Sequence, residues 1–191
     1  MQNRTRGKHF IGVLCDANGR GGGKYVEAAK EVGRQLGTAG YGVVYNAGTG
    51  PMGNALASAA MHTGSPVVGV IPRRTMNELL EGRSAGLPIG TLHVVETQVD
   101  NARVLQSFST AYVALPGGFE ILESILHVVG RADSRPLILV NIDQFFSGLI
   151  SQLERCISSG FSRRSTVNIL KVAHDVSEMS GIIQRELAGA K

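Results

Sequence analysis

Short apolar segments alternate along the chain with longer segments in which apolar residues recur at helical spacing. The short segments are apolar on both faces, which is typical of parallel strands buried between helices. In the longer segments the spacing is three or four residues, as between Val32 and Leu36. Strands are expected at residues 10–15, 42–45, 67–71, 92–95, 111–115, 137–141 and 167–172, and helices at 24–39, from 51, at 76–81, at 99–109, after 118, at 143–158 and from 175.

This alternation predicts the α/β class, with a Rossmann-like doubly wound parallel sheet of about seven strands flanked by helices. No linker composition interrupts the pattern, and 191 residues suit one domain. We therefore expect a single nucleotide-binding domain at residues 9–191, preceded by a mobile basic leader at residues 1–8.

Glycine-rich turns follow two of the predicted strands. The apolar run 111–115 stops at Pro116, and Gly117 and Gly118 lead into a helical pattern. Without Cβ atoms a ligand can approach the backbone, and the N–H groups of the next helix can hold a phosphate or another anion. A plain strand-to-helix turn that needs glycine for geometry alone is the alternative. The second glycine-rich turn, at residues 46–53, favours a ligand site.

The glycine-rich loop at residues 16–23 also follows a predicted strand and precedes a helix, as in nucleotide-binding folds. It lacks the G-x-G-x-x-G dinucleotide fingerprint, so it is weak support for a cofactor of that kind.

The net charge is +4, and the basic residues are scattered rather than concentrated on one element. Pairs such as Arg73–Arg74 and Arg163–Arg164 are typical of a solvated surface, so direct nucleic-acid binding is not expected. Arg73 also follows a predicted strand, at the edge where open α/β sheets bind ligands. It is therefore a candidate for contact with an anionic small molecule.

The two cysteines, Cys15 and Cys156, are far apart and lack metal-ligand spacing. This usage favours a reducing, cytoplasmic compartment and gives no indication of a metal site. No apolar segment approaches the length of a membrane span, so no membrane association is expected.

Several motifs together resemble the Lonely Guy family of cytokinin-activating phosphoribohydrolases, often mislabelled lysine decarboxylases. The similar stretches are Gly12-Val13-Leu14-Cys15, Val44 to Gly53, Val68-Gly69-Val70-Ile71-Pro72, Ala114 to Gly118 and Arg135 to Asp143. The resemblance implies a Rossmann-like homodimer that binds a nucleoside 5′-monophosphate between its glycine turns. It also implies hydrolysis of the N-glycosidic bond, which releases a free adenine-type base and ribose 5-phosphate, without a metal or redox cofactor.

With this resemblance, the expected substrate-binding residues lie in the two glycine turns, after the third strand and on the helix after Gly118. They are Gly48, Thr49, Gly50, Met52, Gly53, Arg73, Pro116, Gly117, Gly118, Glu123 and Ser124.

The positions that carry chemistry depart from the family pattern. Where the family reads P-G-G-x-G-T-x-x-E, the fifth and sixth places are Glu120 and Ile121, and Ser124 stands in place of the catalytic glutamate. The position of the catalytic arginine falls on Asn101, and the nearest arginine is Arg103. The first loop normally reads Cys-Gly-Ser-Ser, but here Asp16 follows the cysteine.

These departures leave Glu120, Arg103 and Asp16 as the candidate catalytic residues. Glu120 lies one helical turn before Ser124, so a carboxylate shifted by one turn could serve a shifted substrate. Glycosidic cleavage needs a group that activates water or protonates the base, and one that stabilises an oxocarbenium-like centre. Glu120 and Asp16 would also repel a phosphate dianion, so binding of a 5′-monophosphate needs compensation by an arginine.

A purely structural role is an alternative for Glu120, Glu123 and Arg103. Glu120 can be a helix N-terminal charge, Glu123 a solvated or dimer-face residue, and Arg103 a partner in a surface ion pair. At the level of the protein, the leading prediction is a hydrolase that acts on a purine nucleotide or a related nucleoside. The alternative is a catalytically silent nucleotide-binding or regulatory paralogue.

Overall fold

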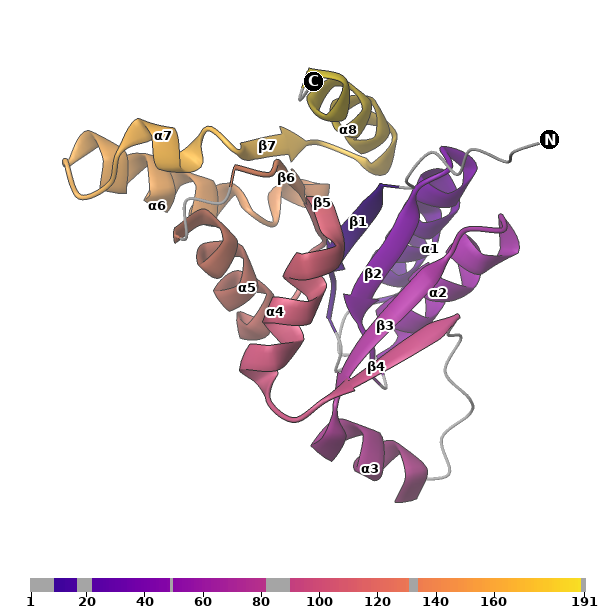
Figure 1. Ribbon diagram of the computed structural model, residues 1–191. Coiled ribbons are helices and arrows are strands. Elements are labelled where there is room, and N and C mark those ends of the chain that lie inside the picture. Colours follow the sequence, from indigo (N-terminus) through magenta and orange to yellow (C-terminus); the bar gives the residue numbers. More distant parts are fainter. Residues whose placement is uncertain (1–8, 17–21, 49, 82–89, 131–133, 190–191) are drawn as a thin grey trace.

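The first strand of the protein lies in the middle of a seven-stranded, all-parallel sheet. The computed structural model describes residues 9–16, 22–48, 50–81, 90–130 and 134–189. The strands are β1 (Phe10–Leu14), β2 (Gly42–Asn46), β3 (Val67–Pro72), β4 (Thr91–Val95), β5 (Ser109–Ala114), β6 (Leu137–Val140) and β7 (Leu170–Ala173). Their order in the sheet is β4-β3-β2-β1-β5-β6-β7, which confirms the predicted doubly wound architecture (Figure 1).

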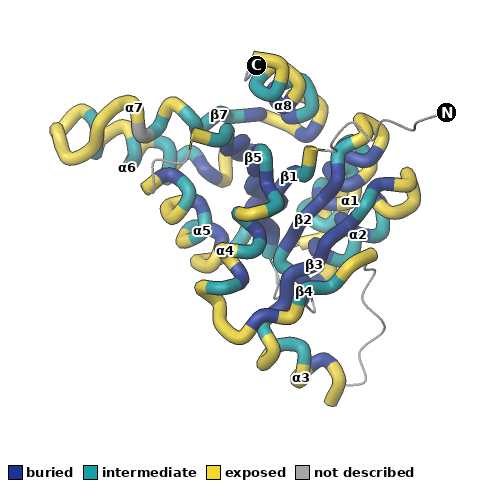
Figure 2. Tube along the Cα trace, viewed as in Figure 1, coloured by how far each residue is buried: buried dark blue, intermediate teal, exposed yellow. Residues whose placement is uncertain are grey.

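Helices cover both faces of this sheet. They are α1 (Gly23–Thr38), α2 (Pro51–His62), α3 (Arg73–Glu81), α4 (Gln98–Phe108), α5 (Phe119–Gly130), α6 (Ser147–Ser158), α7 (Arg164–Val167) and α8 (Val176–Gly189), with a 3-10 turn η1 at Ile142–Gln144. One core lies between the sheet and α1, α2 and α8, and a second core lies between the sheet and α4, α5 and α6. The strands are buried because both faces are covered, as Figure 2 shows for the centre of the sheet.

The two helices α1 and α2 pack closely because α1 has glycines on the side that faces α2. A Cβ atom placed on Gly33 would lie 2.1 Å from the backbone oxygen of Leu56, and one on Gly37 would overlap the side chain of Thr63. Glycine is therefore required at both positions by the approach of the two helices.

The region after β6 differs from the sequence prediction. Asp143 was expected to cap a helix that starts there, but Asp143 and Gln144 have φ angles of 50° and 62°, and α6 begins at Ser147. The side chain of Asn141 accepts a hydrogen bond of 2.7 Å from the Phe146 N–H, which holds the intervening turn. Asp143 pairs with Lys24 at the start of α1 instead. The strand predicted at 167–172 also begins later than expected. A short helix, α7, extends to Val167, and β7 starts at Leu170.

No helix in the described part of the chain combines the length and the apolar character that crossing a membrane requires.

Candidate functional site

The strand order reverses at β1. Strands β2, β3 and β4 extend from one side of β1, and β5, β6 and β7 extend from the other side. The connections that leave β1 and β5 at their carboxyl ends therefore lead to opposite faces of the sheet, which opens a crevice typical of ligand sites in this class of fold. Strands β1 and β5 diverge just after their last backbone hydrogen bond, which the Leu115 N–H donates to the Leu14 oxygen at 2.9 Å.

A cleft of about 450 Å³ lies at this place. Its walls come from the carboxyl ends of β1, β2 and β3, from α4, and from the first turns of α5. The polar side chains that line it are Asn46, Thr75, Gln98, Asn101, Arg103, Gln106, Tyr112, Glu120, Glu123, Ser124 and His127. Residues far apart in the sequence thus converge on one hollow.

Five of the candidate catalytic and binding residues line this cleft. Gly48, Arg103, Glu120, Glu123 and Ser124 line it. The lining does not include the other described residues of the two glycine turns: Gly50, Met52 and Gly53 are buried, and Pro116, Gly117 and Gly118 precede α5. Thr49 lies outside the described residues.

Asp16 lies next to the Pro116 turn. A Cβ atom placed on Gly117 would lie 3.6 Å from the Asp16 Cβ atom and 2.4 Å from the Ile121 side chain. Gly117 is therefore required for close packing of the turn against α5. This is the alternative considered in the sequence, in which glycine serves the geometry of the turn. A Cβ atom on Gly118 would meet nothing within 4 Å, so the backbone is open there.

Arg73 is a candidate whose side chain is engaged outside the cleft lining. Within the described residues the cleft lining does not include it, and its guanidinium pairs with the Glu96 carboxylate at 2.6 Å. This hydrogen bond from Arg73 holds the pKa of Glu96 below its ordinary value. Arg74 pairs with Glu78 at 3.0 Å. Both guanidinium groups are thus already partnered by carboxylates.

Among the described residues that line the cleft are two carboxylates, Glu120 and Glu123, one guanidinium, Arg103, and one imidazole, His127. The Arg103 Nη1 atom lies 3.8 Å from the Asp100 carboxylate. Asp16 adds another carboxylate near the turn. The Ser124 hydroxyl donates to the Glu120 carbonyl oxygen at 2.8 Å, so its proton is engaged within α5. In this arrangement the groups suited to proton transfer are the carboxylates and the His127 imidazole.

Cys15 lines the cleft, yet it is not a nucleophile. Only 1% of its surface is exposed, and burial, followed by the neighbouring Asp16 carboxylate, raises the pKa of its thiol to about 12. At neutral pH the thiolate that reacts with electrophiles is essentially absent. Among the described residues, no group of three or more His, Cys, Asp or Glu side chains is placed to share a metal ion.

This difference between the cysteines predicts selective alkylation. With iodoacetamide at pH 8, we expect the partly exposed Cys156 to be modified and the native Cys15 to be spared. Peptide mass spectrometry measures both sites, and in denaturant both should react. Rapid modification of native Cys15 would contradict the burial described here.

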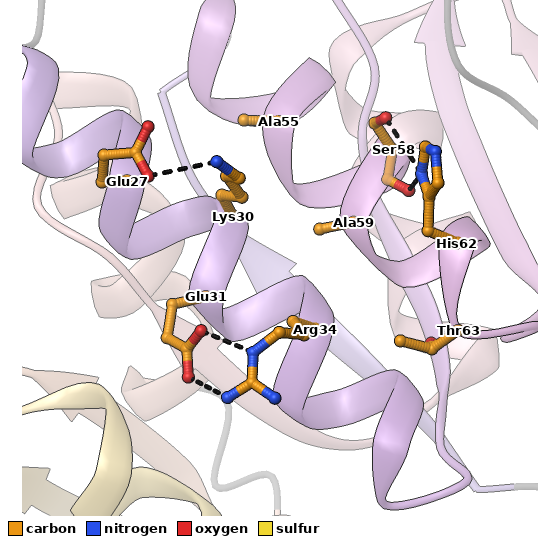
Figure 3. A pocket seen from close by; sticks show the side chains of 9 residues that line it. All are labelled: Glu27, Lys30, Glu31, Arg34, Ala55, Ser58, Ala59, His62 and Thr63. Atoms are coloured by element: carbon orange, nitrogen blue, oxygen red, sulfur yellow. Dashed lines mark hydrogen bonds and ion pairs between the residues drawn. The ribbon is translucent and has the colours of Figure 1, made fainter.

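A second hollow, of about 550 Å³, lies on the outer side of α1 and α2 (Figure 3). Its charged groups are partnered along their own helices: Lys30 with Glu27 at 3.3 Å, and Arg34 with Glu31. The His62 ring bonds to the Ser58 carbonyl oxygen at 2.6 Å. Figure 3 shows these pairs lying along the helix surfaces, so this hollow offers no convergent polar groups for a ligand.

Comparison with known proteins identifies the family of the chain. The family model described as "Possible lysine decarboxylase" matches residues 52–183. The chain is 31% identical to the cytokinin riboside 5′-monophosphate phosphoribohydrolase LOG of Oryza sativa subsp. japonica, over 93% of this chain and 73% of the relative. It is also 31% identical to LOG4 of Arabidopsis thaliana, over 94% and 85% of the two chains. The chain belongs to the Lonely Guy family.

Solved structures with this fold include molybdenum cofactor-binding proteins. The carrier protein of Chlamydomonas reinhardtii aligns with a TM-score of 0.69 at 17% identity, over 95% of this chain and 99% of that chain. The molybdenum cofactor binding protein of Rippkaea orientalis aligns with a TM-score of 0.72 at 14% identity, over 94% and 98%. At these identities the likeness concerns the fold.

Two asparagines of this Lonely Guy protein were not expected at the site. Asn46 and Asn101 both line the cleft, and the buried Oδ1 atom of each has no hydrogen-bond partner within the described structure. Asn101 is only 2% exposed. A buried acceptor without a partner costs about 1–3 kcal/mol of stability. In the sequence, Asn101 stands where the resemblance would place an arginine, and this was the signal for it.

Proposed function

We propose that this Lonely Guy protein hydrolyses the N-glycosidic bond of a purine nucleoside or of its 5′-monophosphate. The observation that carries the proposal is the Glu120 carboxylate in a cleft at the strand-order reversal, where Gly48 and the first turns of α5 converge. Curated relatives at about 30% identity are phosphoribohydrolases by name, which supports the reaction class.

In the proposed reaction, Glu120 takes a proton from a water molecule that attacks C1′ of the sugar. The C1′–N9 bond breaks, its electron pair goes to the base, and the base takes up the proton that Glu120 removed from the water. The products are the free base and ribose, or ribose 5-phosphate from the nucleotide. The carboxylates of Asp16 and Glu120 also stabilise the positive charge that develops at C1′. Arg103 is suited to the departing base, on which negative charge develops.

The test is release of base from a panel of substrates. The purified protein is incubated with adenosine, isopentenyladenosine and their 5′-monophosphates, and the free base is separated by chromatography. We expect base from at least one of the four. If none releases base above the rate of a Glu120→Gln preparation, the proposed reaction is wrong.

A catalytically silent binding or regulatory protein is the second candidate. It is favoured by Ser124 and Asn101, which stand where the resemblance places the glutamate and the arginine of the family. A molybdenum cofactor carrier protein has this fold as well. Calorimetry with the same four compounds separates the two candidates, because binding without turnover supports the silent protein.

We also propose that the protein forms a homodimer in the cytoplasm. The outer side of α5 exposes Phe119 at 89% and Leu126 at 47%, and Val99 at the start of α4 is exposed at 59%. Apolar residues on neighbouring helices favour self-association, and free cysteines are usual in a reducing compartment. Sedimentation velocity tests the dimer, and a monomer at micromolar concentration would exclude it.

A further inference from the structure

The hollow between α1 and α2 is bordered by a row of charges of alternating sign. Along α1 these are Glu27, Lys30, Glu31 and Arg34, whose positions follow the helical period, so all four lie on one face of the helix. Figure 3 shows them along α1, with the small side chains of α2, such as Ala55, beside them. Acids and bases balance within the row. A partner with one sign of charge, such as a nucleic acid or an anionic membrane, is therefore repelled by half of the row.

The order of these charges is complementary to its own reverse. When a second copy of α1 lies antiparallel to the first, with a two-fold axis between positions 30 and 31, residues whose numbers add up to the same total are level with each other. Glu27 of one copy then faces Arg34 of the other, and Lys30 faces Glu31. Every cross-pair of the row joins opposite charges, which is the pattern that a self-complementary interface needs.

The shape of this face also suits close approach by a second copy. On α2, the hollow is lined by the small side chains of Ala55, Ser58 and Ala59. At the two ends of the row on α1, the next positions on the same face are Gly23 and Thr38, which are exposed, uncharged and level with each other in the antiparallel arrangement. The ends of the row therefore add no like-charge repulsion.

The ion pairs within α1 leave hydrogen-bonding capacity for a partner. Arg34 donates to Glu31 from Nε at 2.7 Å and from Nη2, and a guanidinium has five N–H donors in all. Lys30 donates to Glu27 at 3.3 Å, and an ammonium group has three donors. Lys30, Glu27 and Arg34 are exposed. Each of these groups can thus bond within its own helix and across an interface at the same time.

We propose that the face formed by α1 and α2 is a self-association surface, on which a second copy of this chain docks about a two-fold axis with the two α1 helices antiparallel. Helices α1 and α2 pack on the opposite side of the sheet from α4 and α5, so this contact is separate from the one proposed above for the homodimer. Because only two helices form the face, we expect a dissociation constant in the micromolar range.

Variants with a row of one sign test this surface. The acidic variant carries Lys30→Glu and Arg34→Glu, and the basic variant carries Glu27→Lys and Glu31→Lys. Each should self-associate about tenfold or more weakly than the unmodified protein in sedimentation velocity at low salt, because its rows repel each other. An equimolar mixture of the two variants should associate again, since every cross-pair is then opposite in charge. A damaged fold cannot produce this recovery.

The matched control is Arg163→Glu with Arg164→Glu. Both side chains are exposed and lie outside the lining of the hollow, and the net charge changes by the same amount as in the acidic variant. This control should leave self-association unchanged. Raising the salt concentration from about 50 to about 500 mM should weaken association of the unmodified protein, because screening then acts within a few ångströms.

Four results would overturn the inference. An unmodified protein that stays monomeric at about 100 μM leaves this face to solvent or to a different protein. A dimer that both charge variants leave unchanged assigns the contact to α4 and α5. A mixture that does not associate again assigns the loss in the separate variants to stability. An equal loss in the control assigns it to net charge. None of these results bears on the release of base, so the proposed reaction is tested separately.

Discussion

The Glu120→Gln variant is expected to release base about 10²–10⁴-fold more slowly than the unmodified protein, with substrate binding retained. Glutamine keeps the size and the hydrogen-bonding oxygen of the side chain, but it cannot accept a proton from water. A positioned general base contributes an effect of this size. Single-turnover base release measures the chemical step, and calorimetry with the same substrate measures binding. Glu120 is suited to this part because it lines the cleft from the first turn of α5.

Two further variants make this result specific. Glu120→Asp keeps the carboxylate but withdraws it by one methylene group, so an intermediate rate is expected. Glu78→Gln removes a carboxylate that pairs with Arg74 on α3, outside the cleft, and should leave the rate unchanged. If Glu120→Gln keeps the full rate, the carboxylate is a helix N-terminal charge only, and proton transfer belongs to another group.

The Gly33→Ala variant is expected to lower the free energy of unfolding by about 1–3 kcal/mol, near the upper end of that range. The added Cβ atom would lie 2.1 Å from the backbone oxygen of Leu56, and a backbone atom cannot move aside as a flexible side chain does. Helices α1 and α2 must then separate along their whole contact. Urea unfolding followed by circular dichroism measures the change.

Gly148→Ala on α6 is the control for this substitution. Gly148 is exposed, and a Cβ atom there meets nothing within 4 Å, so alanine should stabilise the helix by about 0.5–1 kcal/mol. Opposite signs for the same chemical change would isolate helix packing as the cause. A neutral Gly33→Ala would show that α1 and α2 can adjust their spacing at little cost.

The architecture was predictable because the apolar strand segments are buried on both faces and alternate with amphipathic helices. Single polar residues were less reliable for predicting where a helix begins. Asp143 has the character of a helix cap, but the Asn141 side chain competes for the same turn by accepting the Phe146 N–H, and the helix starts later. Such competition between two capping side chains is decided by backbone geometry that sequence spacing does not contain.

The candidate site was predictable to the extent that it follows strand ends. Glu120 follows one glycine turn and Gly48 belongs to the other, and both line the cleft. Arg73 seemed equally well placed by sequence, but its partner Glu96 lies 23 residues further along the chain. Asn46 resembles an ordinary turn residue in the sequence. Only the burial of its oxygen without a partner marks it, and that depends on how α4 packs against β2.

The central place of β1 has a consequence for synthesis on the ribosome. One edge of β1 pairs with β2 soon after both emerge, but its other edge waits for β5, whose Thr110 hydroxyl donates to the Phe10 oxygen across 100 residues of chain. Until then a flat apolar edge is open to other nascent chains. A translation stall or truncation before β5 should therefore give an aggregating fragment rather than a smaller working protein.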